Sequence, residues 1–228
     1  MRPEDASGSD GHAVDLRVGS AQLAGALLLP SRPLGVVLFV DVSGSTSCSP
    51  SHLFLARALE EAGLASLVLN LLTRSEAAAD ARTGWLRGDV PLLAGRIGAA
   101  LRWLAARAET SDLPVGLFAS DVAAPAALAA ASEEPALAAV VCCAGPALAA
   151  QPGLERVRAP TLLVARAEQP VQAAAGQVLA QLHCEKELAL AQDGAPGGAD
   201  GGLRTVASAA ARWFNQRLAR QWLGANAP

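Results

Sequence analysis

The sequence lacks an excess of basic residues, has only four cysteines and three histidines, and contains no long run of strongly apolar residues. Its 18 basic and 21 acidic side chains give a net charge of −3, which offers no electrostatic basis for binding nucleic acid or an anionic membrane. Much of the hydrophobic content is alanine, and no segment approaches the roughly 20 apolar residues that span a bilayer. The acidic, polar amino-terminal segment lacks the apolar region of a signal peptide. We therefore expect a soluble protein of the cytoplasm.

The cysteines exclude two further classes of protein. Cys142 and Cys143 are adjacent, and Cys48 and Cys184 have no histidine at the spacing of metal ligands. This pattern is neither a disulfide framework nor a zinc site. We expect the adjacent pair to be small buried hydrophobic residues, and we expect neither a metal nor another cofactor.

Short apolar runs alternate with helical segments along the chain. Residues 35–40 are typical of a strand buried on both faces, and residues 49–62 begin with a Ser-Pro helix start and end at Gly63. This alternation predicts an α/β fold with a mostly parallel central sheet and helices on both faces. We expect one domain over residues 13–223, between tails at 1–12 and 224–228. Further strands are expected at 13–18, 22–29, 64–70, 114–118, 137–142, 160–165 and 187–191, and further helices at 87–107, 121–132, 170–182 and 203–223.

Several stretches resemble the small α/β-hydrolases related to dienelactone hydrolase, in particular a bacterial subgroup found beside or fused to phosphoribosyltransferase domains. The resemblance covers nearly the whole domain in the right order, and it implies the α/β-hydrolase fold. In such a sheet, ligands bind where the parallel strands end. The stretches are GVVLFVDVSGST (35–46), LFLARALEEAG (53–63), LLTRSEAAADARTGWLRGD (71–89), LPVGLF (113–118), VRAPTLLV (157–164) and CEKEL (184–188).

The resemblance implies a nucleophile on a sharp turn between a strand and a helix, with glycine two residues before and after it. An ungapped match puts Asp121 in the nucleophile position, with Ser120 one position early and Val122 directly after. Ala119 and Ala123 occupy the two glycine positions. We interpret Asp121 as an N-cap or first-turn acid that the helix dipole stabilises.

The resemblance also implies an oxyanion-hole loop after Val40, where the family has His-Gly-Ser-Gly. This chain has Asp41, Val42, Ser43 and Gly44. A carboxylate near the place where negative charge develops should raise the barrier to acyl transfer.

The acid and the base of the implied triad differ as well. Glu168 stands where the family has aspartate, and glutamate can hold a histidine in this role. The base position falls near Ala195, in a loop without histidine. His12 lies in the expected tail, and His183 precedes a strand and should lie at the opposite edge of the sheet. His52, in the first turn of a helix, is then the histidine of the catalytic face.

The main hypothesis is a catalytically impaired or inactive member of the family that keeps its scaffold. Such a protein could bind a small molecule in the vestigial pocket, form a homo-oligomer, or pair with an active paralogue. The alternative is an active ester or lactone hydrolase with a rearranged site of Asp121, Glu168 and His52. It requires His52 within hydrogen-bond reach of Asp121 or of a water beside it. A third hypothesis is an assembly module without chemistry.

The segment before the long helix offers one further expectation. Arg82 or Arg87 can pair with Asp80 or Asp89 and so brace the loop above the pocket.

Overall fold

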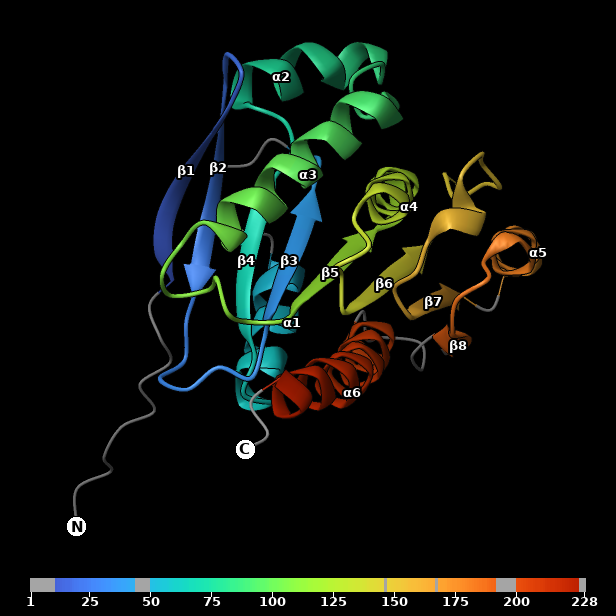
Figure 1. The fold of residues 1–228 in the computed structure, drawn as a ribbon. Coiled ribbons are helices and arrows are strands. Elements are labelled where there is room, and N and C mark those ends of the chain that lie inside the picture. The colour runs from blue at the N-terminus through green and yellow to red at the C-terminus, as the bar shows by residue number, and fades with distance from the viewer. Residues whose placement is uncertain (1–10, 44–49, 146, 167, 192–199, 226–228) are drawn as a thin grey trace.

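One eight-stranded sheet forms the centre of the molecule (Figure 1). The computed structural model describes residues 11–43, 50–145, 147–166, 168–191 and 200–225. The strands follow the order β1-β2-β4-β3-β5-β6-β7-β8 across the sheet. They are β1 (His12–Val18), β2 (Ala21–Leu28), β3 (Val36–Asp41), β4 (Ala65–Asn70), β5 (Val115–Ser120), β6 (Ala139–Ala144), β7 (Thr161–Arg166) and β8 (Lys186–Ala191).

The direction of the strands confirms the expected mostly parallel sheet. β3 is parallel to both β4 and β5, and β6, β7 and β8 continue in parallel from β5. β1 and β2 form an antiparallel hairpin that joins the sheet through β4. Since parallel strands end at the same edge, Asp41, Asn70, Ser120 and Ala144 lie along one carboxyl edge of the sheet.

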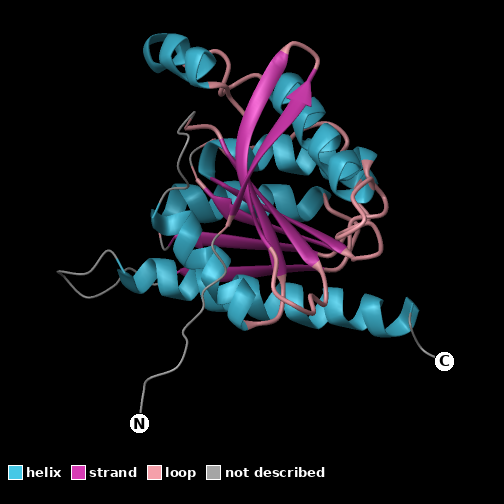
Figure 2. Cartoon of the chain, turned by 90° about the vertical axis from the view of Figure 1, so that its left-hand side faces the viewer, coloured by secondary structure: helices cyan, strands magenta, loops and turns pink. Residues whose placement is uncertain are grey.

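Helices cover both faces of the sheet because successive side chains of each strand point to opposite sides (Figures 1 and 2). Val37 and Phe39 belong to the hydrophobic cluster under α1 and α6. Leu38 and Val40 belong to the cluster under α3, α4 and α5. The helices are α1 (Pro50–Glu61), α2 (Arg74–Thr83), α3 (Val90–Ala105), α4 (Ala124–Glu133), α5 (Gln169–Gln181) and α6 (Asp200–Ala225), with short 3₁₀ turns η1 (Asp121–Ala123) and η2 (Leu154–Arg156).

The prediction of a helix over residues 87–107 is wrong about where the helix begins. α3 begins at Val90, because the Asp89 side chain accepts a hydrogen bond from the N–H of Leu92 and caps the helix, with Pro91 in its first turn. α2 was not expected at all. The sequence feature that indicates α2 is the capping box of Thr73 and Glu76. In this motif the side chain of each residue accepts a hydrogen bond from the backbone N–H of the other.

Several other boundaries differ by a few residues from those expected. The helix expected from position 121 begins as the 3₁₀ turn η1, and α4 follows it. His12, expected in the amino-terminal tail, is the first residue of β1, and α6 continues through Ala225.

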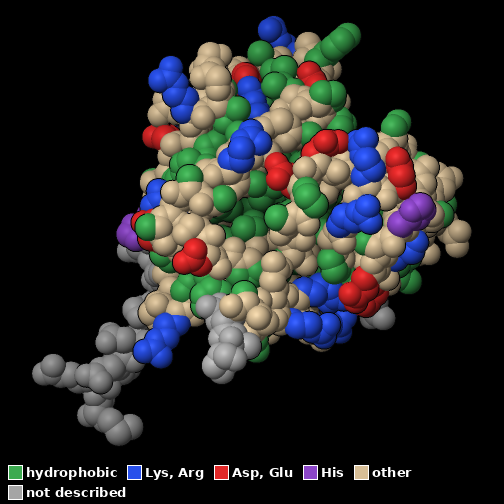
Figure 3. Space-filling view, viewed as in Figure 1, with side chains coloured by type: hydrophobic (Ala, Val, Ile, Leu, Met, Phe, Trp, Pro, Cys, Tyr) green, Lys and Arg blue, Asp and Glu red, His purple; other side chains and the backbone are tan. Residues whose placement is uncertain are grey.

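Charged side chains of both signs are interspersed over the face of the molecule in Figure 3. Some form surface ion pairs, such as Arg156 with Glu133 and Arg102 with Glu134. Within the described ranges, no helix combines the length and the apolar character needed to cross a membrane.

Candidate functional site

Asp121 occupies the sharp turn between β5 and η1. Its φ angle of 45° is the only positive φ among the described residues other than glycine. An aspartate pays a steric penalty in this region of backbone space, and such strain concentrates at functional sites. The side chain is exposed and lies in the first turn of η1, while Ala123 is buried behind it. The structure therefore has the strained strand-to-helix turn that the resemblance implies, with a carboxylate at its apex.

The Asp121 side chain lies against Gly145, the residue after β6. A Cβ atom at Gly145 would overlap Oδ1 of Asp121 and would come within 2.7 Å of its Cγ. Gly145 thus leaves the space that the carboxylate fills. The side chain of Asp121 is directed toward β6 at this edge of the sheet.

The thiol of Cys143 shares this region with Asp121. Burial raises the pKa of Cys143 to about 12, the Arg166 guanidinium opposes this rise, and the Asp121 carboxylate adds to it. Cys142 is fully buried in the cluster under α3, α4 and α5, and burial raises its pKa strongly. Both cysteines are therefore protonated at neutral pH, and neither is a ready thiolate nucleophile.

The loop after β3 is organised by the Asp41 carboxylate. Oδ1 of Asp41 accepts the backbone N–H of Val42 at 2.8 Å, and Oδ2 accepts the Ser43 hydroxyl at 2.6 Å. Asn70, at the end of the neighbouring strand β4, donates its side-chain amide to Ser43 Oγ at 3.2 Å. Each oxygen of the Asp41 carboxylate therefore accepts a hydrogen bond from the loop that directly follows Asp41.

His52 lies beside this loop in the first turn of α1. The side chain is 9% exposed, and its Nδ1 lies 3.8 Å from Oδ2 of Asp41. Burial lowers the pKa of His52, and the Asp41 carboxylate opposes this effect. The structure thus brings together His52 and Asp41, whereas Asp121 contacts Gly145, the residue directly after β6.

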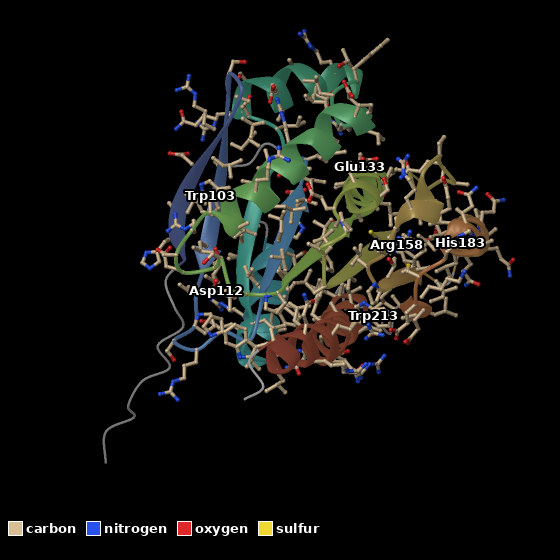
Figure 4. The ribbon with its side chains drawn as sticks, in the orientation of Figure 1. Trp103, Asp112, Glu133, Arg158, His183 and Trp213 are labelled. Carbon is tan, nitrogen blue, oxygen red and sulfur yellow. The ribbon has the colours of Figure 1, made fainter. Side chains whose placement is uncertain are left out.

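The remaining predicted residues lie in different places. Glu168 is the exposed N-cap residue of α5, two residues beyond the carboxyl end of β7. His183 lies between α5 and β8, at the amino end of that strand (Figure 4). His12 is on β1, on the far side of the sheet from β7. Gly44 and Ala195 lie outside the described residues.

The segment between β4 and α3 contains the expected brace. Arg87 Nε donates to Asp80 Oδ2 at 2.6 Å, and the N–H of Leu86 donates to Asp80 Oδ1 at the same distance. Burial opposes ionisation of Asp80, but these hydrogen bonds and the Arg87 charge keep its pKa below the usual value. Asp89 caps α3 instead of pairing with arginine.

Sequence reasoning missed three neighbours of the predicted residues: Asn70, Gly145 and Arg166. Each lies at or just beyond the carboxyl end of a strand that was itself expected. Reading every strand end as part of the site, in addition to the motif positions, would have found them.

A separate surface hollow of about 460 Å³ contains none of the predicted site residues. It lies beside η2 and the end of α5 and is lined by Ala150, Gln151, Pro152, Glu155, Gln181 and His183. Throughout the part of the chain that the structure describes, no three side chains of His, Cys, Asp or Glu are arranged to hold a metal ion.

The chain is similar to solved structures that share its whole fold. Dienelactone hydrolase from Anabaena variabilis is 38% identical, with a TM-score of 0.83 over 91% of this chain and 98% of that chain. A dienelactone hydrolase-like promiscuous phosphotriesterase from metagenomic libraries is 19% identical, with a TM-score of 0.72 over 91% and 98%. A cold-adapted esterase from an Arctic intertidal metagenomic library is 12% identical, with a TM-score of 0.70 over 91% and 94%.

Curated relatives are longer than this chain. Proteins from two strains of Mycobacterium tuberculosis, named as phosphoribosyl transferases, are 38% identical over 152 residues, which is 66% of this chain and 33% of theirs. The chain thus spans one third of the length of the curated relatives it matches. No protein-family model matches the chain.

Proposed function

Because the chain belongs to the dienelactone hydrolase-like family of α/β-hydrolases, we propose that it is a member that has lost most or all ester and lactone hydrolysis. It keeps the family scaffold and serves as a small-molecule-binding or partner subunit. The observation that carries this proposal is the Asp41 carboxylate, which holds the loop where an oxyanion hole would form.

The physical reason lies in the charge that develops during acyl transfer. An oxyanion hole needs free N–H donors aimed at the developing negative charge, and removing one donor typically costs about 10²–10³ in rate. In this protein the Val42 N–H already donates to a carboxylate, and that carboxylate repels a second negative charge. The loop therefore disfavours the transition state that the family fold would otherwise stabilise.

The proton transfers of the reaction lack a suitable base as well. An ester formed on Asp121 would need a histidine to activate the water that releases it. His52 contacts Asp41 at the end of β3. The Asp121 side chain lies against Gly145, which follows β6, and β5 separates β6 from β3 in the sheet. His183 lies at the opposite edge of the sheet. A covalent intermediate on Asp121 would therefore persist instead of turning over.

The test is an assay of the purified protein with p-nitrophenyl acetate and dihydrocoumarin. We expect hydrolysis at the rate of buffer, with no difference between the native chain and its Asp121→Ala and His52→Ala variants. Turnover above buffer that disappears in either variant would overturn the proposal and favour the rearranged site of Asp121, Glu168 and His52. The Anabaena variabilis relative, assayed in parallel, provides the positive control.

A partner role is favoured by the length of the curated relatives, two thirds of which lies outside the matched stretch. We propose that this chain binds a region equivalent to that additional part. Sedimentation velocity of the chain, alone and mixed with the unmatched part of the M. tuberculosis relative, tests this role. A faster-sedimenting complex in the mixture supports it, and independent sedimentation of the two components contradicts it.

A further inference from the structure

The helix α2 is attached to the molecule by charged side chains and by one small apolar residue, the partly buried Ala77, in place of a full apolar stripe. Its sequence is RSEAAADART, and its only buried residue is Asp80. A surface helix normally buries a stripe of apolar side chains against the core. α2 lies at the end of the molecule where β3 terminates (Figure 1). Apart from the packing of Ala77, charged contacts at its two ends hold it there.

The amino-terminal contact is a fork between Glu76 and Arg96 of α3. Arg96 donates from both terminal nitrogens, to Oε2 of Glu76 at 2.8 Å and to Oε1 at 2.5 Å. Oε2 of Glu76 also accepts the backbone N–H of Thr73 at 2.8 Å, which closes the capping box. Bidentate arginine–carboxylate pairs are strong and geometrically specific. Arg96 is 6% exposed, so this contact is partly withdrawn from water.

The carboxyl-terminal contact is the Asp80–Arg87 pair already described, in which Asp80 is 1% exposed. Between Asp80 and Arg87 the chain turns at Gly84 in the left-handed conformation, with φ of 68°. Trp85, the next residue, is 81% exposed. The turn that carries this exposed indole is closed by one ion pair, between Asp80 before the turn and Arg87 after it.

Leu71 connects the Glu76–Arg96 fork to the candidate site. Arg96 donates to the carbonyl oxygen of Leu71 at 2.6 Å, and the N–H of Leu71 donates to the carbonyl oxygen of Asp41 at 2.7 Å. Asn70, directly before Leu71, donates to Ser43. A continuous series of hydrogen bonds therefore runs from α2 to the loop that Asp41 organises.

We infer that α2 with the turn carrying Trp85 is an electrostatically held lid, and that Arg96 acts through Leu71 as a positioning residue for the Asp41 loop. The inference rests on the proposed function only in placing the site at that loop. Opening of the fork releases α2 as a unit and loosens the backbone at Leu71. Closure holds the loop in the arrangement that the structure shows.

Native-state amide hydrogen exchange of the whole chain tests the lid. Glu76→Gln removes the charge of the fork while keeping a similar shape, and we expect exchange at Leu71, at Val42 and throughout α2 to accelerate by at least roughly tenfold. The matched control is Glu134→Gln, which removes the partner of Arg102 on the same helix α3 at a distance of 3.8 Å. In the control, exchange at Leu71 and Val42 should stay within about twofold of the native chain.

A second variant covers the case in which Glu76→Gln fails to fold. Thr73→Ala removes the N-cap hydroxyl and leaves Arg96 paired, and we expect α2 amides to exchange several-fold faster. If Glu76→Gln accelerates α2 and leaves Leu71 and Val42 unchanged, the positioning role of Arg96 is wrong. Unchanged exchange in α2 would overturn the lid itself. Because exchange needs no substrate, these outcomes are distinct from hydrolysis in the assay above, which would overturn the proposed function alone.

Discussion

The Asp41 carboxylate lies 3.8 Å from Nδ1 of His52, at a loop where α/β-hydrolases stabilise an oxyanion. This separation places the imidazole next to the carboxylate that, in the function we propose, opposes acyl transfer. The same carboxylate accepts the Val42 N–H and the Ser43 hydroxyl. The same carboxylate thus engages the Val42 N–H of the loop and lies 3.8 Å from the imidazole of His52.

The pKa of His52 predicts how acid affects folding. Burial lowers this pKa below the usual 6.5, with Asp41 opposing. Since the unfolded histidine titrates near pH 6.5, the unfolded state gains protons first as the pH falls, and the stabilisation present above pH 6.5 decreases. Urea unfolding at pH 7.5, 6.5 and 5.5 should show a smaller loss of free energy of unfolding in His52→Gln than in the native chain. His183→Gln, which changes an exposed histidine, should follow the native profile. Equal losses in all three proteins would contradict the prediction.

The positive φ of Asp121 predicts an order of stability among substitutions. Glycine adopts φ near 45° without steric cost, whereas alanine does so less readily than aspartate. We expect Asp121→Gly to have a free energy of unfolding about 1 kcal/mol greater than that of Asp121→Ala. Urea denaturation of the two variants measures the difference. Equal values, or a more stable alanine variant, would show that the turn relaxes at no cost.

Gly145→Ala should displace the Asp121 side chain. The added Cβ atom would overlap the carboxylate, so we expect a loss of about 1–2 kcal/mol in the free energy of unfolding. In Asp121→Gly the same substitution at Gly145 should cost less, because the side chain that it meets is gone and only the Cα of residue 121, at 3.2 Å, remains close. A double-mutant cycle measures this coupling. Strictly additive effects would mean that the two residues do not restrict each other in solution.

The sheet could be predicted because the short apolar sequences of its strands are themselves typical of buried strands. Residues 36–40 are all apolar, as a strand covered on both faces requires. A strand was expected at residues 35–40. α2 was missed because alanine and charged residues leave it without an apolar period, and the capping box of Thr73 and Glu76 was the remaining local sign. The start of α3 at Val90 depended on the Asp89 cap, which a search for amphipathic periodicity overlooks.

Individual site residues could be located, but their contacts could not. The family motif placed Asp121 at the turn after β5 and Glu168 beyond β7, which is where the structure has them. The contact of Asp121 with Gly145 and the approach of His52 to Asp41 join segments that are distant in sequence. Such contacts depend on side-chain directions at neighbouring strand ends, which residue spacing alone does not determine.

Glu76 predicts a second, more acidic transition, centred on α2. Its pKa is lowered from the usual 4.5 to about 2, chiefly because Arg96 donates hydrogen bonds to it, with burial opposing. The unfolded carboxyl titrates near 4.5, so between pH 4.5 and 2 the unfolded state binds more protons, and the stabilisation present above pH 4.5 is lost. The free energy of unfolding of the native chain should therefore approach that of Glu76→Gln as the pH falls from 6 to 3.

Urea unfolding across this range measures the convergence. Glu133→Gln is the control, since Glu133 pairs with Arg156 while 69% of its side chain is exposed, and an exposed pair of this kind contributes at most about 1 kcal/mol at any pH. A difference between the native chain and Glu76→Gln that stays constant from pH 6 to 3 would mean that the charge of Glu76 does not stabilise the fold. In that case the capping box, which does not need the charge of Arg96, would be the contact that holds α2.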